Sequence, residues 1–281
     1  MRPMLALLAA AAAVLSGPQT PPVANDAAAL LASASRWTEE FERNLSGLIF
    51  RERYLQQAAT SVMGRDGVVN RTEMRLEANV FLLRPEGAPG FVLYRDVYRA
   101  ADRDITDHTT RLHALLTEGT ADAIAQARRL TDESTRHNLG GVTRNTNIPT
   151  MVLEYLRPAH VAALRARIDG RATIDGLRVI VVEFEETGRP TLVRANGHDV
   201  PAKGKYWIDP VTGAVLRAVI ALSPERATGE LDVRFERHPT LNVWVPAEMK
   251  EEWQSAGVNS SGVARYDRFG RLAVSTREIV K

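Results

Sequence analysis

Apolar and polar residues alternate along much of this chain, and this alternation restricts the fold more than any other feature of the sequence. Between residues 73 and 84 the even positions from Met74 to Leu82 are apolar, and residues 230–237 (ELDVRFER) alternate strictly. A period of two is typical of β-strands with one buried face. Turn signals such as DPVTG at 209–213 separate these segments and favour antiparallel pairing. About eight to eleven such strands cannot lie flat, so we expect strong curvature.

The same patterns place the individual elements. Asp26 is expected to cap a helix from Ala27 to about Glu42, and Met151–Leu156 to form a short helical turn. Residues 179–185 (VIVVEFE) have apolar residues at both odd and even positions, which predicts a central strand. A turn is expected at 64–67. The remaining strands are expected at 48–56, 73–84, 91–98, 206–210, 214–222, 230–237, 242–246, 247–254, 263–269 and 271–276.

One block interrupts the strands. From about Asp107 the spacing of apolar residues changes to a helical one, and Ala121–Leu139 is the clearest helix before Gly140 and Gly141 end it. We therefore expect an α+β fold with a strongly curved, mostly antiparallel sheet, forming an open or half-closed barrel. An N-terminal helix and a helical lid insertion at about 106–140 complete it.

The N-terminus has the order of a secretory signal peptide. Arg2 precedes an apolar run from Met4 to Leu15, and small residues and prolines follow. The run is too short to span a bilayer and no other segment is longer, so no transmembrane segment is expected. Residues 1–24 are expected to be signal and linker, cut after Ser16 or Ala24, and residues 25–281 a single β-rich domain. The predicted location is the periplasm or the extracellular space.

The chain has no cysteine and a net charge of only +2. The first fact excludes an N-terminal lipoprotein anchor, a thiol nucleophile and cysteine-ligated metal sites. The second gives no support for nucleic-acid binding. Nucleotide-binding, hydrolase-elbow and zinc-protease motifs are absent, and no histidine pair has metal-ligand spacing. We therefore predict no catalytic residues, no metal and no cofactor, and favour a protein that is not an enzyme.

The densest polar cluster lies at 128–147. Glu133 and His137 are four residues apart, so on a helix they share a face, and they could orient a base or bind an anion alongside Arg144. Arg95, Asp96, Asp107 and Arg111 could join them if the helices fold back onto the sheet. The alternative is an exposed helix with ordinary side-chain pairs.

The aromatic residues are the second candidate site. If the curved sheet encloses a cavity, Trp207, Phe235 and Trp244 on predicted strands would line an apolar pocket, with Arg111 or Arg144 contacting a headgroup. If it does not, they are plain core.

Four stretches of the chain resemble a family of uncharacterised secreted bacterial proteins. They are RDVYR at 95–99, ESTRHNLGGVTRNTNIPT at 133–150, YWIDPVTGAV at 206–215 with WVPAEM at 244–249, and ARYDRFGRLAV at 264–274. His137 stands where a tyrosine is expected, and Gly270 interrupts a more basic stretch. The YWIDPVTG hairpin also resembles the periplasmic lipoprotein-carrier superfamily. That resemblance implies a half-closed barrel whose helices cover a concave apolar face that holds acyl chains.

These observations favour a protein that binds or carries a lipid or other amphiphile in the cell envelope. Two alternatives remain. One is a metal-free hydrolase that uses Glu133 and His137 with Ser134 or Thr135. The other is a structural or interaction protein docked to an envelope protein partner, which an exposed sheet edge or a large apolar patch would favour.

Overall fold

The computed structural model describes residues 26–61, 69–83, 91–105, 129, 133–139, 147–224, 227–255 and 257–271. The helices within these ranges are α1 (Ala27–Leu45), the 3₁₀ helix η1 (Met151–Leu156) and α4 (Pro158–Val161). The strands are β1 (Leu48–Ser61), β2 (Val69–Leu83), β3 (Val92–Ala100), β4 (Arg103–Asp104), β5 (Leu164–Ile174), β6 (Leu177–Glu186), β7 (Val193–Ala195), β8 (His198–Val200), β9 (Ala202–Ile208), β10 (Val215–Leu222), β11 (Ala227–Arg237), β12 (Trp244–Ser255) and β13 (Val258–Arg271).

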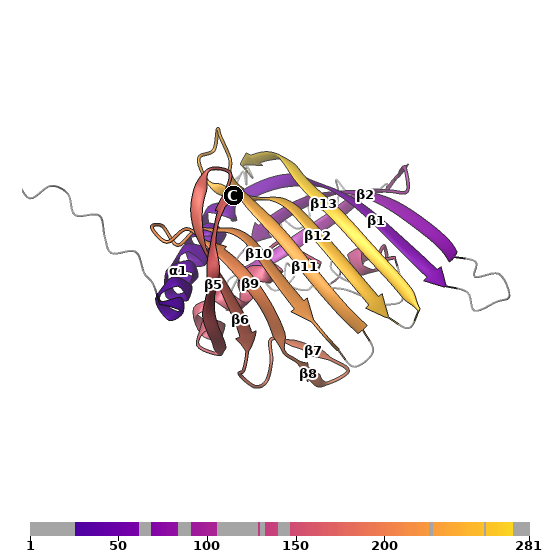
Figure 1. Cartoon of the computed structure of the whole chain (residues 1–281). Helices are drawn as coiled ribbons and strands as arrows, with labels where there is room; N and C mark the ends of the chain where they lie inside the picture. Colours follow the sequence, from indigo (N-terminus) through magenta and orange to yellow (C-terminus); the bar gives the residue numbers. More distant parts are fainter. Residues whose placement is uncertain are drawn as a thin grey trace, which may run out of the picture.

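Eleven strands form one antiparallel sheet in the order β4-β3-β2-β1-β13-β12-β11-β10-β9-β6-β5, and β7 pairs with β8 in a separate hairpin. The sheet curves strongly but does not close, since β4 and β5 stand at opposite ends of the order (Figure 1). The first and last parts of the chain meet at the centre, where β1 pairs with β13. The expected mostly antiparallel, curved and open sheet is confirmed.

The alternation in the sequence separates the two faces of the sheet. On β11, Leu231, Val233 and Phe235 are buried, whereas the residues between them are more exposed. The outer face carries ion pairs between neighbouring strands, such as Arg51 with Asp267 and Arg217 with Asp232, each at 2.7 Å. The inner face is therefore apolar and the outer face charged, as expected for a sheet that buries one side.

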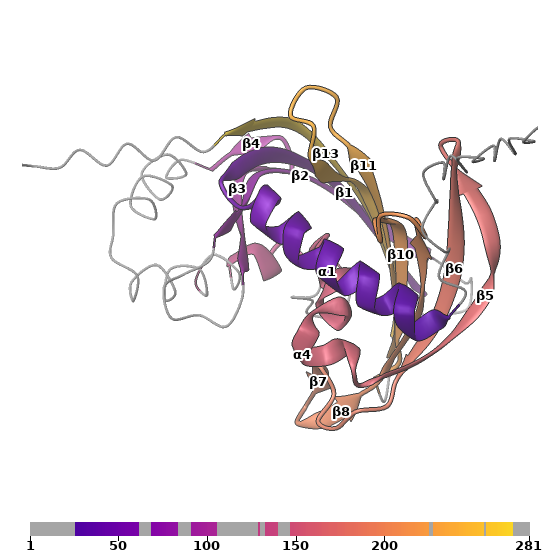
Figure 2. The ribbon, with the colours of Figure 1, turned by 90° about the vertical axis from the view of Figure 1, so that its left-hand side faces the viewer.

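Helix α1 lies across the concave side of the sheet, beside α4 (Figure 2). The Asp26 carboxylate accepts a hydrogen bond from the backbone N–H of Ala28 at 3.1 Å, which confirms the predicted N-cap. Buried residues at helical spacing, including Leu30, Trp37 and Phe41, form the face that packs on the sheet. The helix continues to Leu45, three residues beyond the expected end.

The hairpin β9–β10 is positioned by its turn. Asp209 accepts hydrogen bonds from the Val211 N–H at 2.9 Å and the Thr212 hydroxyl at 2.6 Å. Gly213 adopts a φ of +77°, which favours glycine, and an added Cβ would lie 2.5 Å from the Ser33 hydroxyl oxygen in α1. The turn and α1 therefore pack closely, and both predicted features, the turn and the short helix at Met151–Leu156, are confirmed.

Two strand predictions are wrong. The strand predicted at 179–185 to be central is β6, which lies next to the edge strand β5. Val181 on the outer face pairs with Trp207 of the neighbouring strand. Contact with this indole explains why an apolar residue stands on the outer face of a strand that is not central. The strands predicted at 242–246 and 247–254 are one strand, β12, which passes Pro246 at an irregularity in the β11–β12 register.

Several predictions fall outside the described residues: the signal sequence and its cleavage sites, the turn at 64–67, the strand at 272–276 and most of the helical insertion. In this insertion, residues 129 and 133–135 are helical, 136 and 137 form a turn, and 138 and 139 have no regular secondary structure. Within the described residues no helix is long and apolar enough to cross a bilayer.

Candidate functional site

A buried ion pair lies on the concave face between β1 and β3. The Arg95 guanidinium meets the Glu52 carboxylate through Nε at 2.7 Å and Nη2 at 2.8 Å. The two side chains are 6% and 1% exposed. Burial is the largest influence on the pKa of Arg95 and acts to lower it, but the charge and hydrogen bond of Glu52, together with Tyr266 and Tyr54, outweigh burial and the pKa is raised. Arg95 therefore stays charged within the core.

The ion pair and Gln56 hold a covering segment onto the sheet. Arg95 Nη2 donates to the backbone carbonyl of Asn147 at 2.6 Å. The Gln56 side chain donates to the carbonyl of His137 at 2.9 Å and accepts from the N–H of Leu139 at 3.1 Å. Because these bonds reach backbone atoms, residues 137–139 and 147 are fixed against β1 and β3 whatever their own side chains do.

A second buried polar group lies further along the same face. Glu251 accepts hydrogen bonds from the Tyr54 hydroxyl and from the Trp253 indole, the latter at 3.0 Å. Gly262 makes room for Tyr54, since a Cβ there would lie 2.5 Å from the phenol oxygen. The concave face is thus apolar near α1 and increasingly polar toward β1, β12 and β13.

A cavity of about 340 Å³ opens beside Arg95. Its lining combines two arginines, other polar side chains and two aliphatic residues: Arg95, Val97, Ile105, Glu133, Ser134, Arg136 and His137. Val97 belongs to the buried core and Ile105 packs against it. The cavity therefore joins a polar wall to the apolar interior.

The cavity brings together four residues singled out in the sequence, one of them Ser134 from the hydrolase alternative. Glu133 and His137 line it, and Arg95 joins them as expected if the helical block folds back onto the sheet. Asp96 follows Arg95 on the strand, is fully buried, and does not line this cavity. Asp107, Arg111 and Arg144 lie outside the described residues. Sequence spacing alone pointed to Glu133 and His137, whereas Glu52 and Gln56 were missed because each sits in an ordinary strand pattern.

The polar groups of this cavity have few contacts with one another among the described residues. Burial, aided by the charge of Arg136, lowers the pKa of His137, so the imidazole is neutral at pH 7. Among the contacts of the described residues, none joins the Ser134 hydroxyl to that imidazole by a hydrogen bond. The described residues also contain no group of three or more His, Asp or Glu side chains placed to hold a metal ion.

The aromatic candidates divide between the two faces. Phe235 and Trp244 both pack against Trp37 of α1, with ring centroids 6.1 Å apart in each case. Phe41 completes this cluster, 5.3 Å from Phe235. Trp207 lies on the other face, where its ring is 4.6 Å below the Arg217 guanidinium. The structure therefore brings Phe235 and Trp244 together under α1 and separates Trp207 from them.

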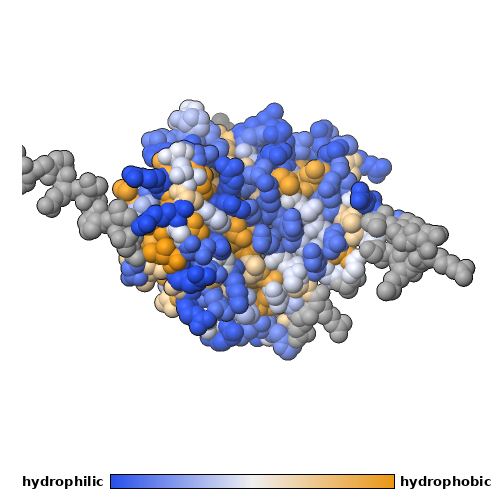
Figure 3. Space-filling model, viewed as in Figure 1, coloured by the Kyte–Doolittle hydropathy of each residue, from blue (hydrophilic) through white to orange (hydrophobic). Residues whose placement is uncertain are grey.

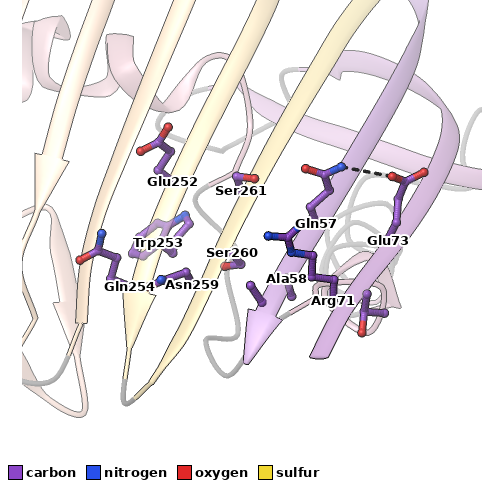
Figure 4. A pocket seen from close by; sticks show the side chains of 12 residues that line it. Gln57, Ala58, Arg71, Glu73, Glu252, Trp253, Gln254, Asn259, Ser260 and Ser261 are labelled. Carbon is purple, nitrogen blue, oxygen red and sulfur yellow. Dashed lines mark hydrogen bonds between the residues drawn. The ribbon is translucent and has the colours of Figure 1, made fainter. Parts of the chain in front are cut away.

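Another pocket, of about 450 Å³, lies between the ends of β1, β2, β12 and β13 (Figure 4). Its lining is mostly polar and exposed, and a hydrogen bond of 3.1 Å from Gln57 to Glu73 crosses one side of it. None of the predicted binding residues contributes to it. We therefore take the concave face and its polar cavity as the candidate site.

No protein-family model matches the chain, and no curated protein matches it. It is similar to a solved structure of a DUF1329 family protein from Desulfovibrio piger, at 13% identity and a TM-score of 0.38, covering 88% of this chain and 93% of that one. A putative outer membrane lipoprotein-sorting protein domain from Vibrio parahaemolyticus has 11% identity and a TM-score of 0.33, covering 85% and 93%. A LolA superfamily protein from Nitrosomonas europaea has 11% identity and a TM-score of 0.30, with the same coverage. The resemblance to lipoprotein-carrier proteins expected from the sequence is thus found among structures too, and at these values it assigns no function.

Proposed function

We propose that this chain is a periplasmic or extracellular protein that binds or carries an amphiphilic ligand on its concave face. One observation carries the proposal: the apolar inner face continues, through Val97 and Ile105, into a cavity with a polar wall. An amphiphile needs that combination, an apolar surface for its chain and polar groups for its head.

The apolar part of the site lies between the sheet and α1. Phe235 is only 3% exposed, so an acyl chain reaches it only if α1 or the segment 147–161 moves outward. Each methylene that is then buried contributes about 0.8 kcal/mol. Helix α1 packs through side chains such as Trp37 and Phe41, a kind of contact that an acyl chain can replace.

The location is proposed from the N-terminal sequence. Arg2 and the apolar run Met4–Leu15 support export, and the absence of cysteine from the chain argues against a lipoprotein anchor. Lipids and envelope proteins are the partners available to a protein exported in this way.

Native mass spectrometry of the exported protein, purified without detergent, tests the proposal. A mass excess that matches a lipid and disappears on denaturation is expected. A bare polypeptide mass, together with no binding of added oleic acid, would contradict the amphiphile-binding function.

A matched pair of tryptophan variants tests the location of the site. Trp244→Ala removes an indole beneath α1, whereas Trp207→Ala removes one from the outer face. We expect Trp244→Ala to reduce the lipid-bound fraction about ten-fold, as the loss of a half-buried aromatic contact predicts, and Trp207→Ala to leave it unchanged. Circular dichroism confirms that both variants are folded. Equal losses would place the ligand elsewhere.

A second candidate function, docking to an envelope protein partner, is favoured by a separate observation. The exposed large apolar side chains of the described residues are Ile168, Leu177 and Val211. Leu177 and Val211 line one hollow of about 750 Å³ between the β5–β6 hairpin and the β9–β10 turn, next to the sheet edge. Figure 3 shows hydrophobic atoms gathered at this left-hand end of an otherwise largely hydrophilic face.

A pull-down from envelope extract tests this second function. The bait is the exported protein, and Leu177→Asp with Val211→Asp is the comparison. Loss of a specific partner in the double variant, with lipid content unchanged, would support docking. Identical capture by both proteins would refute it.

A further inference from the structure

We propose that the cavity beside Arg95 binds an anionic group, a carboxylate or phosphate, at the polar end of the amphiphile. This inference rests on the proposed function and adds the chemical class of the ligand's head. It is carried by the remaining hydrogen-bonding capacity of the Arg95 guanidinium and by a second cation at the same cavity, Arg136, that has no ion pair with any described residue.

Most of the Arg95 fork is occupied. Nη2 donates to the Glu52 carboxylate at 2.8 Å and to the Asn147 carbonyl at 2.6 Å, and Nε lies 2.7 Å from the second Glu52 oxygen as part of the ion pair, without a hydrogen bond of its own. Nη1 has a single long contact of 3.5 Å, to the Asn147 side-chain oxygen. A guanidinium has five N–H donors, so Nη1 retains hydrogen-bonding capacity in a side chain that is 6% exposed. A buried donor whose hydrogen bonds are incomplete destabilises the fold, and an anion is the partner that forms the strongest hydrogen bond with it.

The lining of the same cavity includes a second cation. Arg136 lines the cavity, is exposed, and forms no ion pair with another described residue. Arg95, by contrast, is neutralised by Glu52. An anion in this cavity would therefore meet the charge of Arg136, which no described residue pairs, and the remaining donor capacity of the Arg95 guanidinium.

The remaining lining fits the same ligand. Ser134 adds a hydroxyl donor to the polar wall, and the imidazole of His137, neutral at pH 7, adds one N–H. Glu133 is the acidic residue among the described residues that line the cavity, and it has an interaction partner of its own. Val97 and Ile105 lead from these groups to the core, so the anion would sit at the end of an apolar chain.

Binding of three related compounds to the exported protein tests the inference. They are 1-oleoyl-glycerol 3-phosphate, monoolein, which has the same chain without charge, and glycerol 3-phosphate, which has the charge without the chain. We expect the oleoyl phosphate to bind about ten-fold to a hundred-fold more tightly than monoolein, as a charge-assisted hydrogen bond predicts.

Two arginine variants locate the anion. Arg136→Gln is expected to reduce the preference to about three-fold or less, since it removes the uncompensated cation. Arg36→Gln, on the exposed side of α1, is the matched control and should keep the full preference. Arg95→Lys keeps a cation opposite Glu52 but removes the guanidinium donors. It should therefore also lower the preference for the oleoyl phosphate over monoolein.

The outcomes separate this inference from the proposed function. Equal affinity for the oleoyl phosphate and monoolein would overturn the anion site and leave amphiphile binding intact. A preference that survives Arg136→Gln would overturn the assignment to this cavity. Binding of glycerol 3-phosphate alone, lost in Arg136→Gln, would support the anion site and contradict amphiphile binding. No binding of any compound would contradict both.

Discussion

Replacing Arg95 by methionine removes one partner of a buried ion pair and leaves the other in place. Glu52 is 1% exposed and its carboxylate meets Arg95 twice, at 2.7 and 2.8 Å. A carboxylate left in that position has lost both its water and its counter-ion. Removing one partner of a buried pair costs about 3–5 kcal/mol, and we expect a loss of this size in the free energy of unfolding.

A second variant distinguishes the stranded charge from the lost packing. Arg95→Met combined with Glu52→Gln leaves no charge at this pair, yet it lacks the same bond from Arg95 to Asn147. That bond is worth about 1–3 kcal/mol. The double variant should therefore be more stable than Arg95→Met alone by roughly 1–2 kcal/mol, although it carries one more substitution.

Urea unfolding at pH 7, followed by circular dichroism, measures both differences. The dependence of unfolding free energy on urea should be similar in the three proteins, because the surface exposed on unfolding is nearly the same. If the double variant is as unstable as Arg95→Met or less stable, the stranded Glu52 carboxylate is not the cause of the loss, and the reasoning fails.

Three further results are expected. Gln56→Leu should speed amide hydrogen exchange at Leu139, because it removes a partner of that N–H. Gln57→Leu loses only an exposed bond to Glu73 and should leave this exchange rate unchanged. Equal exchange rates at Leu139 in the two variants would show that Gln56 does not hold the segment. Burial raises the pKa of Glu154 to about 7; the charge of Arg157 opposes this rise and that of Glu42 adds to it. The folded state therefore keeps a proton on Glu154 that the unfolded state releases from pH 4.5 upward. Unfolding free energy should therefore fall by up to about 3 kcal/mol as the pH rises through this window, and Glu154→Gln should flatten the urea-measured profile; an unchanged profile would exclude Glu154 as its source. Gly213→Ala should lower stability by about 1–3 kcal/mol in thermal unfolding, because φ is +77° and a Cβ would meet Ser33, while Gly270→Ala, with open space around it, should have a much smaller effect.

Local features of this protein were predictable because short segments specify them. Asp26 caps α1 since its side chain reaches an N–H two residues away, and the DPVTG turn forms since Asp209 bonds its own neighbours. Alternation likewise places Tyr206 and Trp207 on opposite faces of β9 whatever surrounds the strand. The order of elements and the curved, open sheet follow from patterns of this kind.

The candidate site was less accessible to such reasoning, because its parts come from distant positions. Glu133 and His137 could be paired by helical spacing, but Arg95 meets them only when residues 133–139 fold back onto β3. Glu52 and Arg95 are 43 positions apart and are neighbours only through the pairing of β1, β2 and β3. Spacing within a segment cannot report such contacts.

By itself, then, the sequence determined most of the strands, helix α1 and η1, and which residues of a strand lie on opposite faces, since these depend on interactions between near neighbours. The strands β4, β5, β7 and β8 were not among the predicted segments. Only the tertiary structure decided which face of each strand is concave, that Trp244 lies under α1 while Trp207 lies outside, and that β6 adjoins an edge. Those outcomes depend on which strands pair and on what covers them. Burial of apolar surface stabilises this arrangement only when distant segments of the chain come into contact.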